Sequence, residues 1–225
     1  DYRLIALAPA SVQEMADFVG LAFDLAFKYR NPAIILADGV IGQMMEKVVL
    51  PEQRPRLTNE EVMARCPWAT FGKLKHRGPN IVTSLELDPA EMEKRNIHLQ
   101  QKYAEIEEKE VRYEEIHCDD AEYLIVAFGS CARIAQKAME EARAEGIKVG
   151  LLRPITLWPF PSKAIAERSR QVKGILTVEL NAGQMVEDVR LAVECKVPVE
   201  YFGRLGGIVP DPDEVVTALK EKIIK

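Results

Sequence analysis

The sequence lacks the residue clusters that mark several common protein classes. It has only three histidines, none of them three or four residues from another, and four cysteines, none of them in a CxxC pair. Iron–sulfur clusters and structural zinc usually require closely spaced cysteines, so neither is predicted from this chain alone. The four cysteines are far apart along the chain: Cys66, Cys118, Cys131 and Cys195.

Long apolar runs, a signal peptide and a basic excess are also missing. The longest stretches without Asp, Glu, Lys or Arg are ten residues, about half of the length that a membrane helix needs. With 30 basic and 35 acidic residues the net charge is −5, which argues against nucleic acid as the main partner. Scattered thiols in an acidic chain of this kind predict a cytoplasmic protein.

The known catalytic and nucleotide-binding motifs do not occur either. There is no GxSxG, HExxH or P-loop, and the string Phe128–Ala132 lacks the third glycine of a dinucleotide-binding loop. Cys131, just inside a helix start, could have a lowered pKa, but a small buried residue is the more ordinary interpretation. We therefore predict no catalytic residue and no metal ligand in this chain.

The composition is that of an ordinary globular protein, 48% hydrophobic and 29% charged. Residues 1–50 contain one strand–helix–strand unit, with strands predicted at 4–8 and 33–36. Ser11 and Glu14 form a capping-box pattern at the start of the helix, which runs to about Tyr29. Two strands cannot form an α/β layer by themselves. We expect this segment to be the end of a larger α/β domain.

Residues 51–117 are predicted to be a connector. Prolines punctuate it, and from residue 86 to 115 half of the residues are charged. Pro89 begins a predicted helix to about Arg112, with a narrow apolar stripe at Leu99, Tyr103 and Ile106. A helix lying on its own domain or on a partner explains this pattern best, and a charged binding tail remains the alternative.

Residues 118–225 alternate cleanly between strands and helices. Four such pairs predict a complete, doubly wound α/β domain. The strands are predicted at 123–128, 148–152, 174–178 and 198–202.

Open α/β sheets bind ligands beyond the carboxyl ends of their strands, so the residues there are the site candidates. In the second domain these are Asn181, Gln184 and Arg204, which we expect to face an anion, the substrate or a partner subunit. Tight turns, an asparagine cap and a surface arginine are the alternative interpretation. In the first segment, Asp38, Gly42 and Gln43 follow a strand end and either line a crevice or form an ordinary turn.

Several strings resemble the α subunit of 2-oxoacid:ferredoxin oxidoreductases over nearly the whole chain. They are Leu7–Met15, Leu36–Gly42, Leu152–Pro161 (LRPITLWPFP), Val178–Met185 (VELNAGQM) and Gly203–Gly207. The stretch from Pro79 to Met92 is most similar to the branched-chain (2-oxoisovalerate) type, and the 2-oxoglutarate type is the alternative. A stand-alone α/β interaction module without catalysis is the rival from another class.

The resemblance implies an enzyme that decarboxylates a 2-oxoacid on thiamine diphosphate, reduces ferredoxin through iron–sulfur clusters and forms an acyl-CoA. Residues 1–50 would be the end of its pyrimidine-binding domain, and residues 118–225 its transketolase C-terminal-like domain. The resemblance places the diphosphate, the Mg²⁺ and the cluster cysteines on β- and γ-type partner subunits. No cofactor is therefore expected in this fragment, and the fragment alone should be inactive.

Overall fold

The structure is a computed structural model that describes residues 2–69 and 78–224. The chain divides into two units. One consists of residues 1–49 and 106–225, and the other of residues 50–105. Each unit is described by itself.

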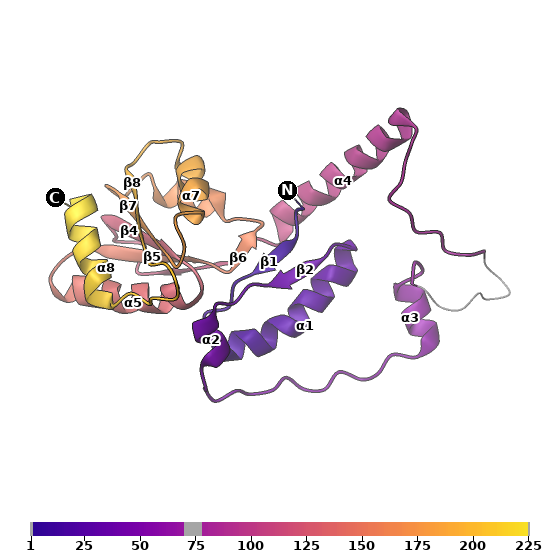
Figure 1. Cartoon of the computed structure of the whole chain (residues 1–225), viewed down its shortest axis with the longest axis horizontal. Coiled ribbons are helices and arrows are strands. Elements are labelled where there is room, and N and C mark those ends of the chain that lie inside the picture. The colour runs from indigo at the N-terminus through magenta and orange to yellow at the C-terminus, as the bar shows by residue number, and fades with distance from the viewer. Residues whose placement is uncertain (1, 70–77, 225) are drawn as a thin grey trace. The chain divides into compact units, whose positions relative to one another are not determined.

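The first unit begins with a short parallel pair of strands and a covering helix. β1 (Ile5–Leu7) pairs in parallel with β2 (Ala33–Ile35), and α1 (Val12–Tyr29) connects them (Figure 1). The predicted capping signal is present, since the Ser11 hydroxyl accepts a hydrogen bond from the Glu14 N–H at 3.1 Å. The Glu14 carboxylate reaches back one residue farther than in the usual box, to the N–H of Ala10 at 2.7 Å.

A third strand in this small sheet comes from far along the chain. β6 (Thr156–Trp158) pairs antiparallel with β1, which gives the order β2-β1-β6. β6 was not predicted, because its three residues lie among the prolines at positions 154, 159 and 161. β1 is consequently paired on both sides, and Ile5 and Leu7 are fully buried.

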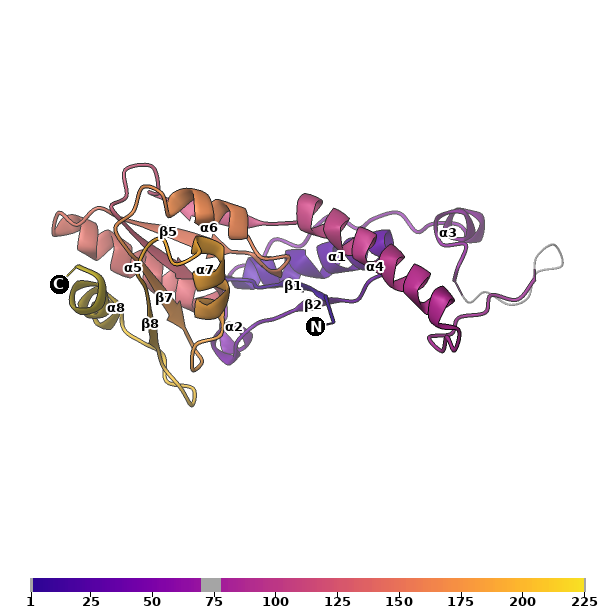
Figure 2. The ribbon, with the colours of Figure 1, turned by 90° about the horizontal axis from the view of Figure 1, so that it is seen from above.

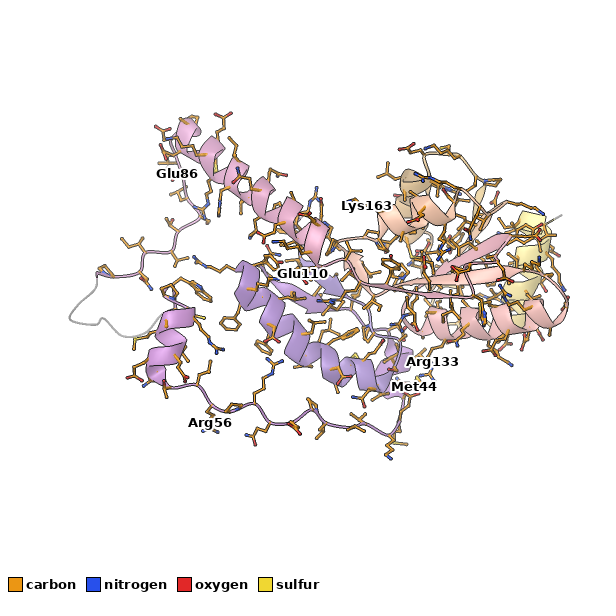
Figure 3. The ribbon with its side chains drawn as sticks, turned by 180° about the vertical axis from the view of Figure 1, so that it is seen from behind. Met44, Arg56, Glu86, Glu110, Arg133 and Lys163 are labelled. Atoms are coloured by element: carbon orange, nitrogen blue, oxygen red, sulfur yellow. The ribbon has the colours of Figure 1, made fainter. Side chains whose placement is uncertain are left out.

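The last turn of α4 (Pro89–Lys109) also covers this region. Ile106 is fully buried and packs with Ile5, Leu25 and Tyr29. α4 ends three residues before the predicted position. Just after the helix, the buried carboxylate of Glu110 accepts hydrogen bonds from Lys28 and Tyr29. Figure 3 labels Glu110 at this end of α4.

The larger sheet of the first unit has five strands in the order β3-β5-β4-β7-β8. The four predicted strands are confirmed, and they are mutually parallel. Their bounds are β4 (Tyr123–Ala127), β5 (Val149–Pro154), β7 (Ile175–Glu179) and β8 (Val199–Gly203). An unpredicted edge strand, β3 (Tyr113–Ile116), pairs antiparallel with β5, so this sheet begins five residues before position 118.

Two helices cover each face of this sheet, as a doubly wound fold requires. α5 (Gly129–Ala144) and α8 (Pro212–Leu219) pack on one face, and α6 (Ser162–Arg168) and α7 (Met185–Val193) on the other (Figures 1 and 2). A π-helical turn, η1 (Lys220–Ile224), extends α8. Separate apolar cores fill the two faces, which explains why the strands are continuous apolar runs.

The second unit holds α3 (Asn59–Arg65) and most of α4. Thr58 and Glu61 form a capping box at the start of α3, and Asp88 caps α4. Residues 70–77 of the predicted connector lie outside the described residues. None of the described helices is both long and apolar enough to span a membrane.

Candidate functional site

The carboxyl ends of β4, β5, β7 and β8 lie on one edge of the large sheet, as predicted. β4 lies between β5 and β7. The next strand in the chain, β5, is added on one side of β4, and the later strands β7 and β8 are added on the other side. Ligands of doubly wound sheets bind at this switch point. A cavity of about 140 Å³ lies there, lined by residues of three segments: Leu36–Asp38, Phe128–Gly129 with Cys131, and Glu179–Asn181.

Glu179, at the end of β7, is a buried and hydrogen-bonded carboxylate of this site. It is 1% exposed, and its carboxylate accepts hydrogen bonds from the backbone N–H groups of Gln184 (3.1 Å), Met185 (2.8 Å) and Val186 (2.9 Å). These are the first donors of α7, which has no cap from its own N-cap side chain. The donors predicted to face an external anion are therefore occupied by this chain's own carboxylate.

Asn181 shapes the turn between β7 and α7. Its Oδ1 accepts a hydrogen bond from the Gly183 N–H at 2.8 Å, and its carbonyl oxygen accepts one from the Tyr201 hydroxyl. The Tyr201 side chain needs the space above Gly203, because a Cβ there would overlap its hydroxyl and lie 2.8 Å from the Glu179 carbonyl. The turn is consequently held by its own Asn181 side chain and by Tyr201 of β8.

Asp38 reaches this edge from the first segment. Its Oδ1 accepts hydrogen bonds from the N–H groups of Val40 and Ile41, both at 3.0 Å, and thereby caps α2 (Gly39–Gln43). Its Oδ2 accepts a hydrogen bond from the Ser130 N–H in the first turn of α5, at 3.1 Å. Burial would raise the pKa of Asp38, but the hydrogen bonds from Ser130 and from the α2 backbone lower it overall.

The electrostatics of the cavity are therefore acidic. Burial raises the pKa of the Cys131 thiol to about 12, and the nearby charges of Asp38 and Glu179 add to the effect. Cys131 is 3% exposed and stays a neutral thiol, in agreement with the ordinary interpretation. Burial, followed by the nearby Glu179 carboxylate, also raises the pKa of Tyr201.

The structure brings two of the six predicted site residues together at the cavity, Asp38 and Asn181. The side chain of Gln184 is exposed, and only its backbone N–H contacts the site. Gly42 and Gln43 lie on α2, exposed and outside the cavity lining. The Arg204 guanidinium is paired with Glu214, at the start of α8, and its backbone N–H donates to the Glu179 carbonyl at 3.2 Å.

Two further carboxylates of the first segment contact the large sheet and its helices. Glu14 forms a two-bond pair with the buried Arg153 at the end of β5, with N···O distances of 2.6 and 3.2 Å. Glu46 pairs with Arg133 of α5 at 2.6 Å. Figure 3 labels Arg133 beside Met44, at the end of α2. These pairs were not predicted, because a single sequence does not show which distant charged residues will be neighbours in the fold.

Glu179 and Tyr201 were also missed as site residues. Glu179 left a readable signal, because an acidic residue ends a buried strand a few residues before the start of a helix. Tyr201 and Gly203 are two residues apart and therefore lie on the same face of β8. This spacing is a weaker indication that Tyr201 belongs to the site.

The residues at this edge do not fit the cofactors that the sequence resemblance implies. A diphosphate would meet the carboxylates of Asp38 and Glu179, and none of the described residues that line the cavity is basic. Within the described ranges, no group of three His, Cys, Asp or Glu side chains could hold a metal ion. Burial raises the pKa of Cys118 to about 11, so neither of the two buried thiols is prepared to act as a thiolate ligand.

Comparison with known proteins identifies the family. The profile described as "Pyruvate flavodoxin/ferredoxin oxidoreductase, thiamine diP-bdg" matches residues 1–116, and "Pyruvate:ferredoxin oxidoreductase core domain II" matches residues 121–215. The first match alone covers more than half of the chain.

The chain is 48% identical to the ketoisovalerate oxidoreductase subunit VorB of Methanothermobacter thermautotrophicus, over 98% of this chain and 61% of that protein. It is 31% identical to the 2-oxoglutarate synthase subunit KorA of Methanothermobacter marburgensis, over 97% of this chain and 64% of that protein. The chain thus spans less than two thirds of the length of these relatives.

A solved structure of 2-oxoglutarate:ferredoxin oxidoreductase from Magnetococcus marinus, with 2-oxoglutarate, coenzyme A and succinyl-CoA bound, shares the fold. Its TM-score is 0.73 at 21% identity, over 96% of this chain and 42% of that chain. The α/β fold class and the family predicted from the sequence are confirmed. The chain belongs to the 2-oxoacid:ferredoxin oxidoreductase family.

Proposed function

We propose that the whole protein is the α-type subunit of an enzyme that oxidatively decarboxylates a branched-chain 2-oxoacid to its acyl-CoA and reduces ferredoxin. The observation that carries the proposal is the difference in identity, 48% to a ketoisovalerate oxidoreductase subunit against 31% to a 2-oxoglutarate synthase subunit. Both comparisons cover at least 97% of this chain, so the two identities are calculated over nearly the same residues.

In this proposal, the 225-residue chain contributes to the contacts that hold the subunits of the enzyme together. Its cavity is small and acidic, its helix starts are occupied by carboxylates, and its candidate arginine is paired with Glu214. Thiamine diphosphate belongs to the complete enzyme, with Mg²⁺ and the iron–sulfur clusters on β- and γ-type subunits in the cytoplasm. Asn181, Gln184 and Arg204 remain candidates for contacts with a partner subunit.

The test is CoA-dependent reduction of a viologen dye by the purified complex, with 2-oxoisovalerate, 2-oxoglutarate and pyruvate compared at equal concentrations. We expect the highest kcat/KM for 2-oxoisovalerate. A preference for 2-oxoglutarate would support the alternative substrate class, and no dye reduction with any 2-oxoacid would support a non-catalytic module. The 225-residue chain by itself should be silent in the same assay.

A further inference from the structure

Asp38 uses its two carboxylate oxygens for two different helices. Oδ1 accepts the N–H groups of residues 40 and 41 and caps α2, the helix that follows it. Oδ2 accepts the N–H of Ser130, which lies 92 residues away in the first turn of α5. One side chain therefore joins the first segment to the large sheet.

The start of α5 is built to receive this carboxylate. Its N-cap residue, Phe128, gives no side-chain hydrogen bond, and its first turn contains no acidic residue. Gly129 has a φ of +61°, and a Cβ at this position would lie 3.3 Å from Asp38 Oδ2. A side chain at position 129 would thus be both strained and in the way of the carboxylate.

Two other ion pairs between the first segment and the large sheet or its helices have the same direction. Glu14 and Glu46 supply the carboxylates, and Arg153 and Arg133 supply the donors. Negative groups of the first segment thus meet donors of the large sheet and its helices at each of these three points.

We propose that Asp38 is a positioning residue that caps α5 from the first segment. Its carboxylate stands where a doubly wound sheet would hold an anionic ligand, at the N-terminus of the helix after β4. Asp38 then holds α2 and the first turn of α5 together. As long as its hydrogen bond to Ser130 is present, an external anion cannot bind at the start of α5. The proposal concerns the joint alone and stands whether or not the enzyme has the function proposed above.

Asp88 offers a matched control. It caps α4 with the same geometry, since its Oδ1 accepts the N–H groups of Ala90 (2.8 Å) and Glu91 (3.1 Å). Among the described residues, it has no hydrogen bond to a second helix. Asp88→Ala should therefore loosen its own helix and leave α5 unchanged.

Hydrogen exchange in the whole subunit tests the proposal with two substitutions. Asparagine is as good an N-cap as aspartate, so Asp38→Asn should keep the cap of α2 and lose only the bond to Ser130. We expect the first-turn amides of α5 to exchange about 5- to 30-fold faster, the effect of losing one helix cap, with α2 unchanged. Asp38→Ala should loosen both helices. Unchanged exchange of α5 in both variants would overturn the proposal.

Chemical rescue provides the second measurement. Formate can enter the space that Asp38→Ala vacates, so it should restore the protection of α5 in that variant and have no effect on the wild type. Chloride at equal ionic strength is the control for screening. If α5 loosens and formate and chloride act alike, the carboxylate does not stand in an anion position, and that part of the proposal is wrong.

Discussion

Replacing Glu179 is the sharpest test of how the candidate site is built. In Glu179→Gln one carboxylate oxygen becomes an NH₂ group, which cannot accept a hydrogen bond and faces N–H donors instead. Either the two bonds to Oε2 or the single bond to Oε1 are lost. The remaining oxygen has no negative charge with which to stabilise the start of α7.

The magnitude follows from these contacts. A hydrogen bond to a charged group contributes about 1.5–3 kcal/mol, and a charge at a helix end about 0.3–1 kcal/mol. We expect Glu179→Gln to lower the free energy of unfolding by about 2–3 kcal/mol. Glu179→Ala should cost about 3–5 kcal/mol, because it leaves the N–H groups of the buried residues Met185 and Val186 without a partner.

Urea denaturation followed by circular dichroism measures this difference, and thermal unfolding should show a fall of about 4–12 °C. Glu187→Gln is the matched control, since Glu187 is an exposed acid in the first turn of the same helix. It should cost no more than about 1 kcal/mol. Equal effects of the two glutamine variants would refute the reasoning, because the loss would then come from helix charge and not from the three hydrogen bonds.

Further substitutions and one thiol-labelling experiment test other parts of the structure. Gly203→Ala should cost about 1–3 kcal/mol by displacing Tyr201, and Tyr201→Phe about 1 kcal/mol, both measured by urea denaturation. Arg153→Ala should cost about 3 kcal/mol because it removes the cationic partner of the half-buried Glu14, whereas Lys196→Ala in an exposed pair should cost under about 0.5 kcal/mol. Because the pKa of Asp38 is held below its ordinary value of 3.8, its ionised form stabilises the fold above about pH 4 and the effect is lost as the pH falls further. Asp38→Asn should thus lose less stability than the wild type between about pH 5 and pH 2. In a thiol-labelling experiment Cys195 should react quickly and the buried Cys118 and Cys131 slowly, and fast labelling of either buried thiol would contradict the structure.

The regular part of the fold could be predicted because its signals are local. Continuous apolar runs marked β4, β5, β7 and β8, and Ser11 marked the start of α1. The missed strands, β3 and β6, are three or four residues long and gain their stability from partners elsewhere in the chain. A short edge strand with two glutamates has no local reason to be extended.

The position of the candidate site could be predicted from the sequence, but the acidic character of its cavity could not. The strand ends showed where the residues would gather, and Asp38 and Asn181 do line one cavity. The sequence could not show that two carboxylates would fold onto the helix starts, or that Glu214 would pair with Arg204. These contacts depend on tertiary packing. Because of them, the site that was expected to favour an anion is lined by carboxylates instead.

The strand β6 has a consequence for how the protein is synthesised. Its Trp158 pairs with Ala6, so the first sheet cannot be completed until more than 150 residues have left the ribosome. At about 5–20 residues per second, β1 waits roughly 8–30 s with one edge open. An unpaired apolar strand can join a neighbouring chain during that time. We therefore expect a folding chaperone to improve the yield of the whole protein, and expression of residues 1–117 without β6 to give aggregates.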